Sequence, residues 1–413
     1  MSAAELALRG ARVVGHDGPV DILVSGGRIA SLARPGEAAE AAREIAAGGR
    51  LVIPGFVDSH IHLDKACLNG RCGHLQGGPG GLKAAIAAVS ALKRDFTVED
   101  VHRRGARVIE KAIARGTTHM RTHVEVDPRV GLRSFEAIRA LRRDYAWALD
   151  LSICVFPQEG LTNDPGTAEL LEAALAGGAD LLGGCPYTDT DPAAHVAALF
   201  DLARRHDVDL DFHVDFDLDP GWNHLELILR HTEAAGYGGR VAVGHATKLS
   251  AMDPAVRDAL ADRMAGAGVA LTVLPATDLY LMGREADRRV PRGLAPLHLL
   301  AARGVTGSIA TNNVLNPFTP FGDGSLLRMA NLYANAAQVD PGAFPLCLDL
   351  VTRQPARLMR LAGYGIAPGN PADLVVLDAA GPAEAVAEIA EPILGFKAGR
   401  ASFERPAARL LPP

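Results

Sequence analysis

The chain has 413 residues, 48% of them hydrophobic, and a formal net charge of −6. This length suits one large barrel with a small satellite, or two to three average domains. The mildly acidic balance has no block of like charge, which argues against nucleic acid or an anionic membrane surface as a partner. We expect a cytoplasmic protein, because no leader follows Met1 and no apolar run approaches the ~18 to 20 residues of a spanning helix. The five cysteines are sparse and odd in number, so we expect reduced thiols.

Both ends of the chain predict short strands. Apolar and polar side chains alternate there between glycine-rich turns, which is typical of a small antiparallel unit. Two or three such strands are marginal alone, so we expect both termini to build one small β-sandwich domain, residues 1–52 plus 364–413. The candidate strands are residues 6–14, 20–24, 28–32, 372–378 and 392–402.

Residues 52–65 are the most informative stretch. They begin as an apolar, β-branched run that predicts a buried strand, and they end with His60 and His62. Residues i and i+2 of a strand point to the same side, so the two imidazoles are aimed at one point. Neutral imidazole is the commonest protein ligand of metals, which indicates a metal site. The alternative is two ordinary histidines in a loop.

Between the terminal strands the pattern changes to strands alternating with helices. We predict eight parallel βα units over residues 53–363, and eight such units close into a TIM-like barrel. Chemistry in these barrels lies at the carboxyl ends of the strands. After the strand of residues 52–65, the predicted strands are 118–126, 150–158, 179–187, 208–215, 240–246, 269–275 and 305–313.

Several of these strands finish in a polar side chain that could reach a common centre. Each of these strands ends in such a residue independently of the others, so the prediction of the fold and the prediction of the site support each other. A single inward histidine such as His123 is also compatible with a hydrogen-bonded core residue. The strand-end residues are His60, His62, His123, Gln158, His213, Asp215, His245, Asn312 and Asn313.

Seven segments resemble the amidohydrolase superfamily, in particular the branch that contains cytosine deaminase and N-isopropylammelide amidohydrolase. Their order and spacing make the superfamily match specific, whereas they do not select one substrate. The segments are residues 54–65, 121–124, 155–160, 211–215, 244–246, 312–318 and 365–375.

The resemblance implies one divalent metal ion, zinc or iron. Its ligands would be His60, His62, His213 and the residue at the position of Asn312. The family has an aspartate at the fourth position, which ligates the metal and takes the proton of the attacking water. Asn312 can offer a weak carbonyl ligand, but an amide cannot act as a base. No lysine ends the fourth strand, so one metal is expected rather than two.

Other candidates could bind substrate or move protons. The resemblance implies that Gln158 pairs with a heterocycle and that His245 manages protons, since an unperturbed imidazole titrates near pH ~6.5. Lys65 is similar to a lysine of the ammelide hydrolase and could bind a substrate oxygen; the alternative is a surface lysine. Asn313 is a further candidate for substrate binding.

Two carboxylates follow His213 at intervals of two. Strand alternation would place both on the side of His213. Asp215 is therefore a candidate proton-transfer group, and Asp217 is a candidate for substrate binding; the alternative for Asp217 is that it caps a helix. Phe216 stands where cytosine deaminase has a glutamate that protonates the ring, so protonation in that manner is not available.

These patterns predict a metal-dependent hydrolase that cleaves a C–N bond, by deamination or deamidation, in a small nitrogen heterocycle. One alternative is a cyclic amide or N-alkyl amide hydrolase. Another is a barrel that binds ligand without turnover, because of Asn312. The loops of residues 69–81 and 277–292 are expected to define the substrate, and the resemblance implies assembly into homo-oligomers.

Overall fold

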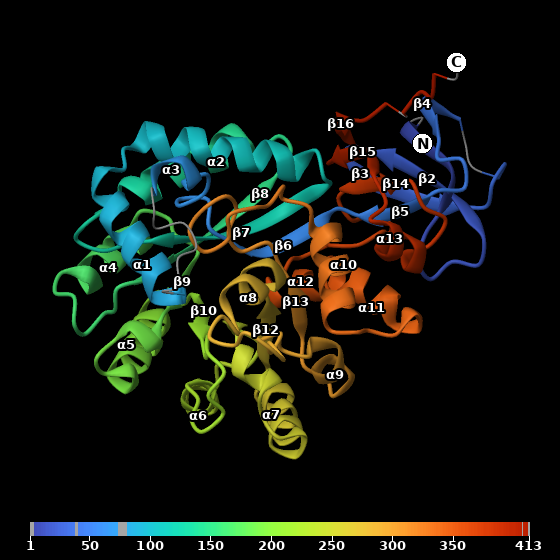
Figure 1. The fold of residues 1–413 in the computed structure, drawn as a ribbon. Helices are drawn as coiled ribbons and strands as arrows, with labels where there is room; N and C mark the ends of the chain where they lie inside the picture. The colour runs from blue at the N-terminus through green and yellow to red at the C-terminus, as the bar shows by residue number, and fades with distance from the viewer. Residues whose placement is uncertain (1–3, 38–39, 73–80, 407, 412–413) are drawn as a thin grey trace.

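The chain forms a parallel barrel with a smaller β unit on one flank, as the computed structural model of residues 4–37, 40–72, 81–406 and 408–411 shows (Figure 1). The barrel sheet runs in chain order from β6 to β13. Its strands are β6 (Phe56–Ile61), β7 (Thr117–Glu125), β8 (Asp150–Phe156), β9 (Leu181–Gly184), β10 (Asp209–Val214), β11 (Val241–His245), β12 (Val269–Val273) and β13 (Gly307–Ile309). The predicted eight-stranded barrel is confirmed.

The barrel closes at the segment that carries the candidate site. An isolated parallel bridge joins Ile61 to Asn312. The backbone N–H of His62 donates to the Asn312 carbonyl at 2.9 Å, and the Asn312 N–H donates to the His60 carbonyl at 2.8 Å. Closure therefore holds the first and last strands together at the level of the two histidines.

The smaller β unit is one sheet drawn from both ends of the chain, and its blue and red strands lie side by side in Figure 1. This confirms the predicted contribution of both termini. The strand order is β16-β15-β14-β5-β1-β2-β3, with β4 paired to β1. The strands are β1 (Ala4–Arg12), β2 (Pro19–Ser25), β3 (Arg28–Ala33), β4 (Ala41–Ala46), β5 (Leu51–Pro54), β14 (Leu374–Leu377), β15 (Pro392–Lys397) and β16 (Arg400–Glu404).

Residues 52–65 are not one strand, as the sequence suggested, but two strands in different sheets. β5 pairs with β14 in the small unit, whereas β6 pairs with β7 in the barrel. Gly55 separates them, and a Cβ atom there would lie 2.2 Å from the Thr118 side chain. The close approach of Thr118 allows only glycine at the crossing, so we propose Gly55 as the division between the two units.

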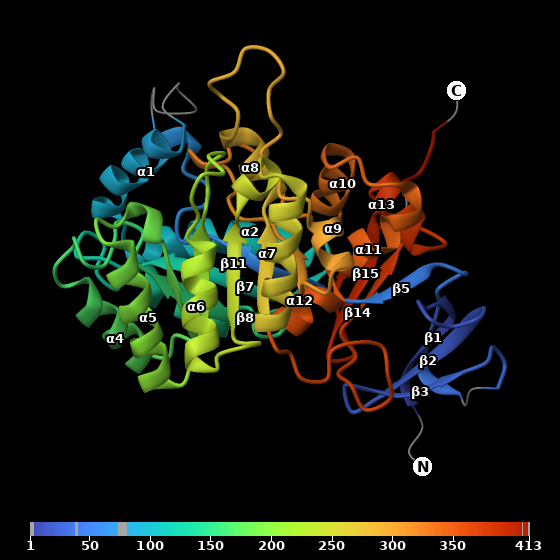
Figure 2. The same ribbon diagram turned by 90° about the horizontal axis from the view of Figure 1, so that it is seen from below.

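Helices cover the outside of the barrel, and several begin with strong capping residues. Asp191 caps α5 and Asp253 caps α7, each followed by a proline in the first turn. The helices are α1 (Gly81–Leu92), α2 (Val98–Ile113), α3 (Arg133–Asp144), α4 (Thr167–Ala176), α5 (Pro192–His206), α6 (Leu225–Ala235), α7 (Pro254–Ala267), α8 (Pro275–Leu281), α9 (Leu297–Ala302), α10 (Leu326–Ala336), α11 (Phe344–Asp349), α12 (Arg353–Leu358) and α13 (Pro382–Glu388). Figure 2 shows α1 and α8 toward the same end of the barrel.

Two further expectations concern the chain as a whole. All five cysteines are free, as predicted. In the ranges that the structure describes, we find no helix with both the length and the apolar character needed to cross a membrane. Most of the loop of residues 69–81, which we expected to help define the substrate, lies outside the described residues.

Candidate active site

Three imidazoles meet at the carboxyl end of the barrel, two from the β6 segment and one from β10. Nε2 of His213 lies 3.0 Å from Nε2 of His60 and 3.2 Å from Nε2 of His62. Burial, with nearby positive groups, lowers the pKa of all three well below the ordinary value, so the rings are neutral at pH 7. Three neutral imidazole nitrogens aimed at one point form a donor set for a divalent cation.

Asn312 lies beside these histidines through its backbone bonds to His60 and His62. Its side chain is buried, and neither Oδ1 nor Nδ2 has a hydrogen-bond partner among the described residues. An unpaired buried polar group costs about 1–3 kcal/mol, so a partner is expected for it. Its Oδ1 is available as a fourth, uncharged ligand, and the four residues together fit a divalent metal.

The β11 strand ends at His245, whose ring is fixed on two sides. Its Nδ1 donates to Oδ1 of Asp278 at 2.6 Å, and the other Asp278 oxygen accepts from the backbone N–H of Leu274 at 3.1 Å. The Phe216 ring stacks on the imidazole, with centroids 3.8 Å apart and planes at 19°. A neutral His245 held in this way has its acceptor lone pair on Nε2.

His245 and Asn312 also share an unusual backbone conformation. Their φ angles are 70° and 60°, in the left-handed region that residues other than glycine rarely adopt. Such strain is concentrated at functional sites, where the surrounding structure holds it in place.

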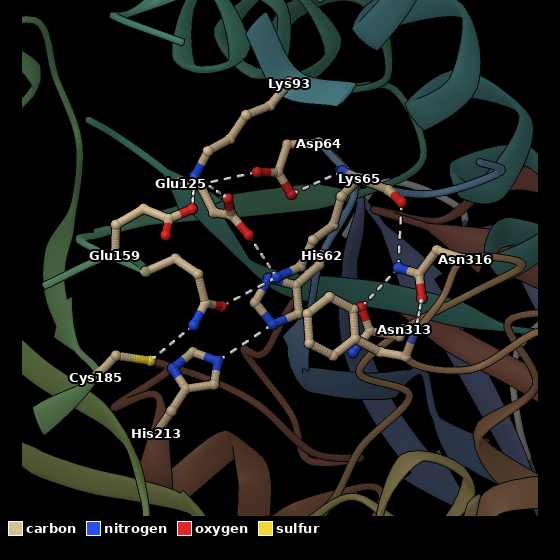
Figure 3. A network of polar contacts seen from close by, with 12 residues as sticks. His62, Asp64, Lys65, Lys93, Glu125, Glu159, Cys185, His213, Asn313 and Asn316 are labelled. Carbon is tan, nitrogen blue, oxygen red and sulfur yellow. Dashed lines mark hydrogen bonds and ion pairs between the residues drawn. The ribbon is translucent and has the colours of Figure 1, made fainter. Parts of the chain in front are cut away.

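Lys65 is buried, which excludes the alternative of a surface lysine. Its Nζ donates to Oε1 of Glu125 at 2.7 Å and to Oε1 of Gln158 at 3.4 Å, and it lies 4.5 Å from the centre of the Phe318 ring. Figure 3 shows the Lys65 side chain beside Glu125 and the imidazole of His62. Lys65 and Gln158 thus lie together beside the histidines.

Glu125 is a site residue that the sequence analysis missed. Its second oxygen accepts from Nζ of Lys93 at 2.8 Å, and Lys93 also pairs with Asp127 at 2.5 Å and Glu159 at 2.9 Å. Burial opposes the ionisation of Glu125, but Lys65 and Lys93 outweigh it and lower the pKa of this carboxyl to about 2. Glu125 and Asp127 follow His123 at intervals of two, and this spacing could have indicated them.

The His123 ring contacts all three converging histidines. Its ring stacks on that of His60, with centroids 3.7 Å apart, and its Nε2 is 3.5 Å from Oδ2 of Asp211. The same Asp211 oxygen accepts from Arg121 at 2.9 Å. His123 therefore packs against one face of the His60 ring.

The expectation that Asp215 faces the same centre as His213 is wrong. Its φ is 51°, which breaks the alternation, and its carboxylate instead accepts from the backbone N–H groups of His224 at 2.7 Å and Leu225 at 3.1 Å. It therefore caps the start of α6. The Asp217 carboxylate pairs with Lys248 at 3.2 Å and is 38% exposed.

Asn313 is buried and belongs to a network of amides. Its Oδ1 accepts from Nδ2 of Asn316 at 2.7 Å, and the same Nδ2 donates to the carbonyl oxygen of Lys65 at 3.1 Å. Figure 3 shows Asn313 and Asn316 adjoining the Lys65 backbone. The network ties the loop after β13 to the loop after β6, while a contact with substrate stays a prediction.

Gly244 allows the His60 ring to lie where it does, since a Cβ atom at position 244 would be 3.1 Å from its Cε1 and 3.3 Å from its Nδ1. We expect Gly244→Ala to displace this ring and weaken metal binding about tenfold or more, measured by competition with a chelator. Gly266→Ala is the matched control, because no atom lies within 4 Å of a Cβ atom there. Equal metal affinity of the two variants would contradict the assignment of His60 as a ligand.

A parallel barrel with converging histidines and an oriented imidazole–carboxylate pair at its carboxyl end defines the class of barrel enzymes whose site lies at the strand ends. The amidohydrolase family model matches residues 43–149 and 105–400. The chain belongs to the amidohydrolase family, which confirms the resemblance found in the sequence.

Similar proteins act on several heterocycles. A pterin deaminase of Rhizobium rhizogenes (strain K84 / ATCC BAA-868) is 31% identical over 89% of this chain and 85% of the relative. The crystal structure of 5-methylcytosine deaminase from Klebsiella pneumoniae liganded with 5-fluorocytosine is 29% identical, with a TM-score of 0.93 over 98% and 99% of the two chains. That of N-isopropylammelide isopropylaminohydrolase from Burkholderia multivorans is 32% identical, with a TM-score of 0.84 over 97% and 98%.

Proposed function

We propose that this chain is a metal-dependent hydrolase that cleaves a C–N bond, by deamination or deamidation, in a small nitrogen heterocycle. The observation that carries the proposal is the meeting of three Nε2 atoms, at 3.0 and 3.2 Å, beside the unpaired amide of Asn312. The family and the deaminases and amidohydrolases among its relatives support this reaction class.

One divalent ion, zinc or iron, is the proposed cofactor. His60, His62 and His213 would hold it, with Oδ1 of Asn312 as the fourth protein ligand. When bound, the ion would act as a Lewis acid that makes water nucleophilic at neutral pH. Because Asn312 cannot accept a proton, this chain needs another base.

His245 is the proposed base. Its Nδ1 donates to Asp278, which leaves the lone pair of Nε2 to accept a proton and stabilises the imidazolium that results. As the oxygen of water bonds to the ring carbon, one water proton passes to Nε2, and the π electrons of that carbon's C=N or C=O bond move to its nitrogen or oxygen, from which they return as the leaving group departs. The C–N bond then breaks, and His245 returns the proton to the leaving nitrogen, which departs as ammonia or an amine.

Gln158 and Lys65 are the proposed substrate-binding groups. The Gln158 amide offers a donor and an acceptor, which matches a ring nitrogen and an adjacent carbonyl. Its Nε2 donates to the Cys185 sulfur at 3.4 Å, and this contact orients the amide. The Lys65 ammonium would bind an oxygen of the substrate. Asp215 acts through the start of α6, as a positioning residue.

A substrate screen with the metal content measured tests the proposal. Protein loaded with zinc or iron is offered aminopyrimidines, aminotriazines, pterins and cyclic amides, and the release of ammonia or amine is followed. We expect turnover of at least one nitrogen heterocycle at about one bound ion per chain. Asn312→Asp is tested in parallel, with tighter metal binding expected because a carboxylate replaces a neutral ligand. An inert parent chain and an active Asn312→Asp variant would instead favour a binding barrel without turnover.

A further inference from the structure

A cavity of about 860 Å³ opens beside the candidate reaction centre. Residues that follow β8, β9 and β10 form one side, and α1 forms the other. Ligand sites in proteins typically measure ~300–1,000 Å³ and enclose most of the ligand, so a lone six-membered ring at the histidines would leave this space unfilled. We call this cavity the outer chamber.

Two residues of the outer chamber connect it to the candidate reaction centre. Phe216 lines it and also stacks on the His245 imidazole at 3.8 Å. Tyr187 lines it as well, and its hydroxyl accepts from the Cys185 thiol at 3.4 Å, whose sulfur in turn accepts from Gln158. A ligand bound by Gln158 next to His245 therefore has the chamber as its neighbouring space.

The walls of the outer chamber are largely apolar. Leu82 and Ile86 lie one turn apart on the same face of α1. The opposite wall includes Phe216 and Trp222, and the Trp222 side chain is 46% exposed. An exposed indole next to an apolar helix face is typical of a binding surface rather than of a core.

Trp222 is held in place although it is exposed. Nζ of the fully buried Lys248 lies 3.4 Å from the centre of the indole ring and donates to the Trp222 carbonyl at 2.7 Å. The ring of His224 packs edge-on at 4.8 Å. A rigid aromatic surface loses little conformational entropy when it binds a ligand.

The charges around the outer chamber do not call for a charged ligand. Two basic side chains, Lys83 and Arg94, and two acidic ones, Glu159 and Asp217, line it. Both carboxylates already have partners, since Glu159 pairs with Lys93 at 2.9 Å and Asp217 with Lys248 at 3.2 Å. The four side chains sum to no net charge, and Lys83 and Arg94 are exposed to solvent, so the lining offers no buried unpaired charge to a ligand.

We propose, resting on the proposed function, that the natural substrate is an extended heterocycle. Its reacting ring lies at the histidines, and an uncharged apolar or aromatic part, as a substituent or a fused ring, fills the outer chamber between α1 and Trp222. Burial of this part would supply binding energy remote from the reacting carbon.

Cytosine, 5-phenylcytosine and 6-phenylcytosine test the proposal as probes on zinc-loaded protein. The chain has two tryptophans, so in the Trp147→Phe background the fluorescence reports on Trp222 alone. We expect at least one phenyl isomer to quench this signal and to bind about tenfold tighter than cytosine. Two chamber variants should abolish most of the preference for the phenyl isomer. They are Ile86→Asp, which places a charge on the chamber wall, and Trp222→Ala, whose binding is measured by calorimetry because its fluorescence reporter is gone. Trp147→Phe, outside the chamber, should retain the preference.

The outcomes separate the extended substrate from the reaction itself. In one outcome, a phenyl isomer binds more tightly, the chamber variants abolish this gain, and no probe or screened compound is turned over. That outcome supports the extended substrate and contradicts the hydrolase. Turnover in the screen, with equal binding of all three probes and no effect of the chamber variants, supports the hydrolase and overturns the extended substrate. Failure of every probe to bind also overturns it.

Discussion

Replacing His213 with asparagine is expected to remove the metal ion and to abolish hydrolysis. Of the three histidines, His213 is the one whose Nε2 contacts both others, at 3.0 and 3.2 Å. The substitution leaves two imidazoles and two neutral amides, too weak a donor set to retain the ion. We expect bound metal to fall from about one ion per chain to about a tenth of that, and kcat/KM to fall by about 10³-fold or more.

Elemental analysis after dialysis and steady-state kinetics measure this result. His206→Asn is the matched control, because that histidine is exposed in the last turn of α5, far from the site in the fold. Circular dichroism checks that both variants fold. A folded His213→Asn protein that keeps a full equivalent of tightly bound metal would refute the proposed ligand set.

Replacing Glu125 with glutamine is expected to have the largest effect on stability. Glu125 is the only carboxylate that pairs with Lys65 in the described part of the chain, and both side chains are 3% exposed or less. The substitution leaves a buried ammonium without a counter-charge, and breaking a buried pair in this way costs about 3–5 kcal/mol. Lys93 keeps Asp127 and Glu159, so the loss falls mainly on Lys65.

Thermal and urea unfolding compare this variant with Glu233→Gln. Glu233 pairs with Arg263 through both oxygens, but its side chain is 42% exposed, and an exposed pair that water and salt screen contributes little to stability. We expect a clear drop of the unfolding midpoint for Glu125→Gln and almost none for the control. Equal midpoints would mean that the ion network does not stabilise the loops around the site.

Several features of the site were predictable because they depend on local pattern. Parallel strands that are buried on both faces appear as continuous apolar runs, as in β11 and β12, and helices separate them. The alternation of side chains along a strand then paired His60 with His62. Barrel closure, a property of the fold class, placed these two histidines next to the β13 end and Asn312.

Other features depend on contacts that no local pattern records. Asp215 was expected beside His213, but its own left-handed backbone conformation at the strand end turns its carboxylate toward the backbone at the start of α6. Lys93 follows an ordinary helix, and 32 residues separate it from its partner Glu125. Asp278 lies in a helix that we did not predict, 33 residues after the His245 ring it orients.

The sequence by itself determined the barrel, the contribution of both termini to the small sheet, and the strands that end in imidazoles, because backbone periodicity fixes the direction of a side chain within an element. The tertiary structure alone decided which charges are buried together, which side chain orients His245, and that a large apolar chamber adjoins the site. These features arise where the chain turns at strand ends and where distant segments pack. There the low dielectric of the interior makes each charge depend on neighbours that are far away in sequence.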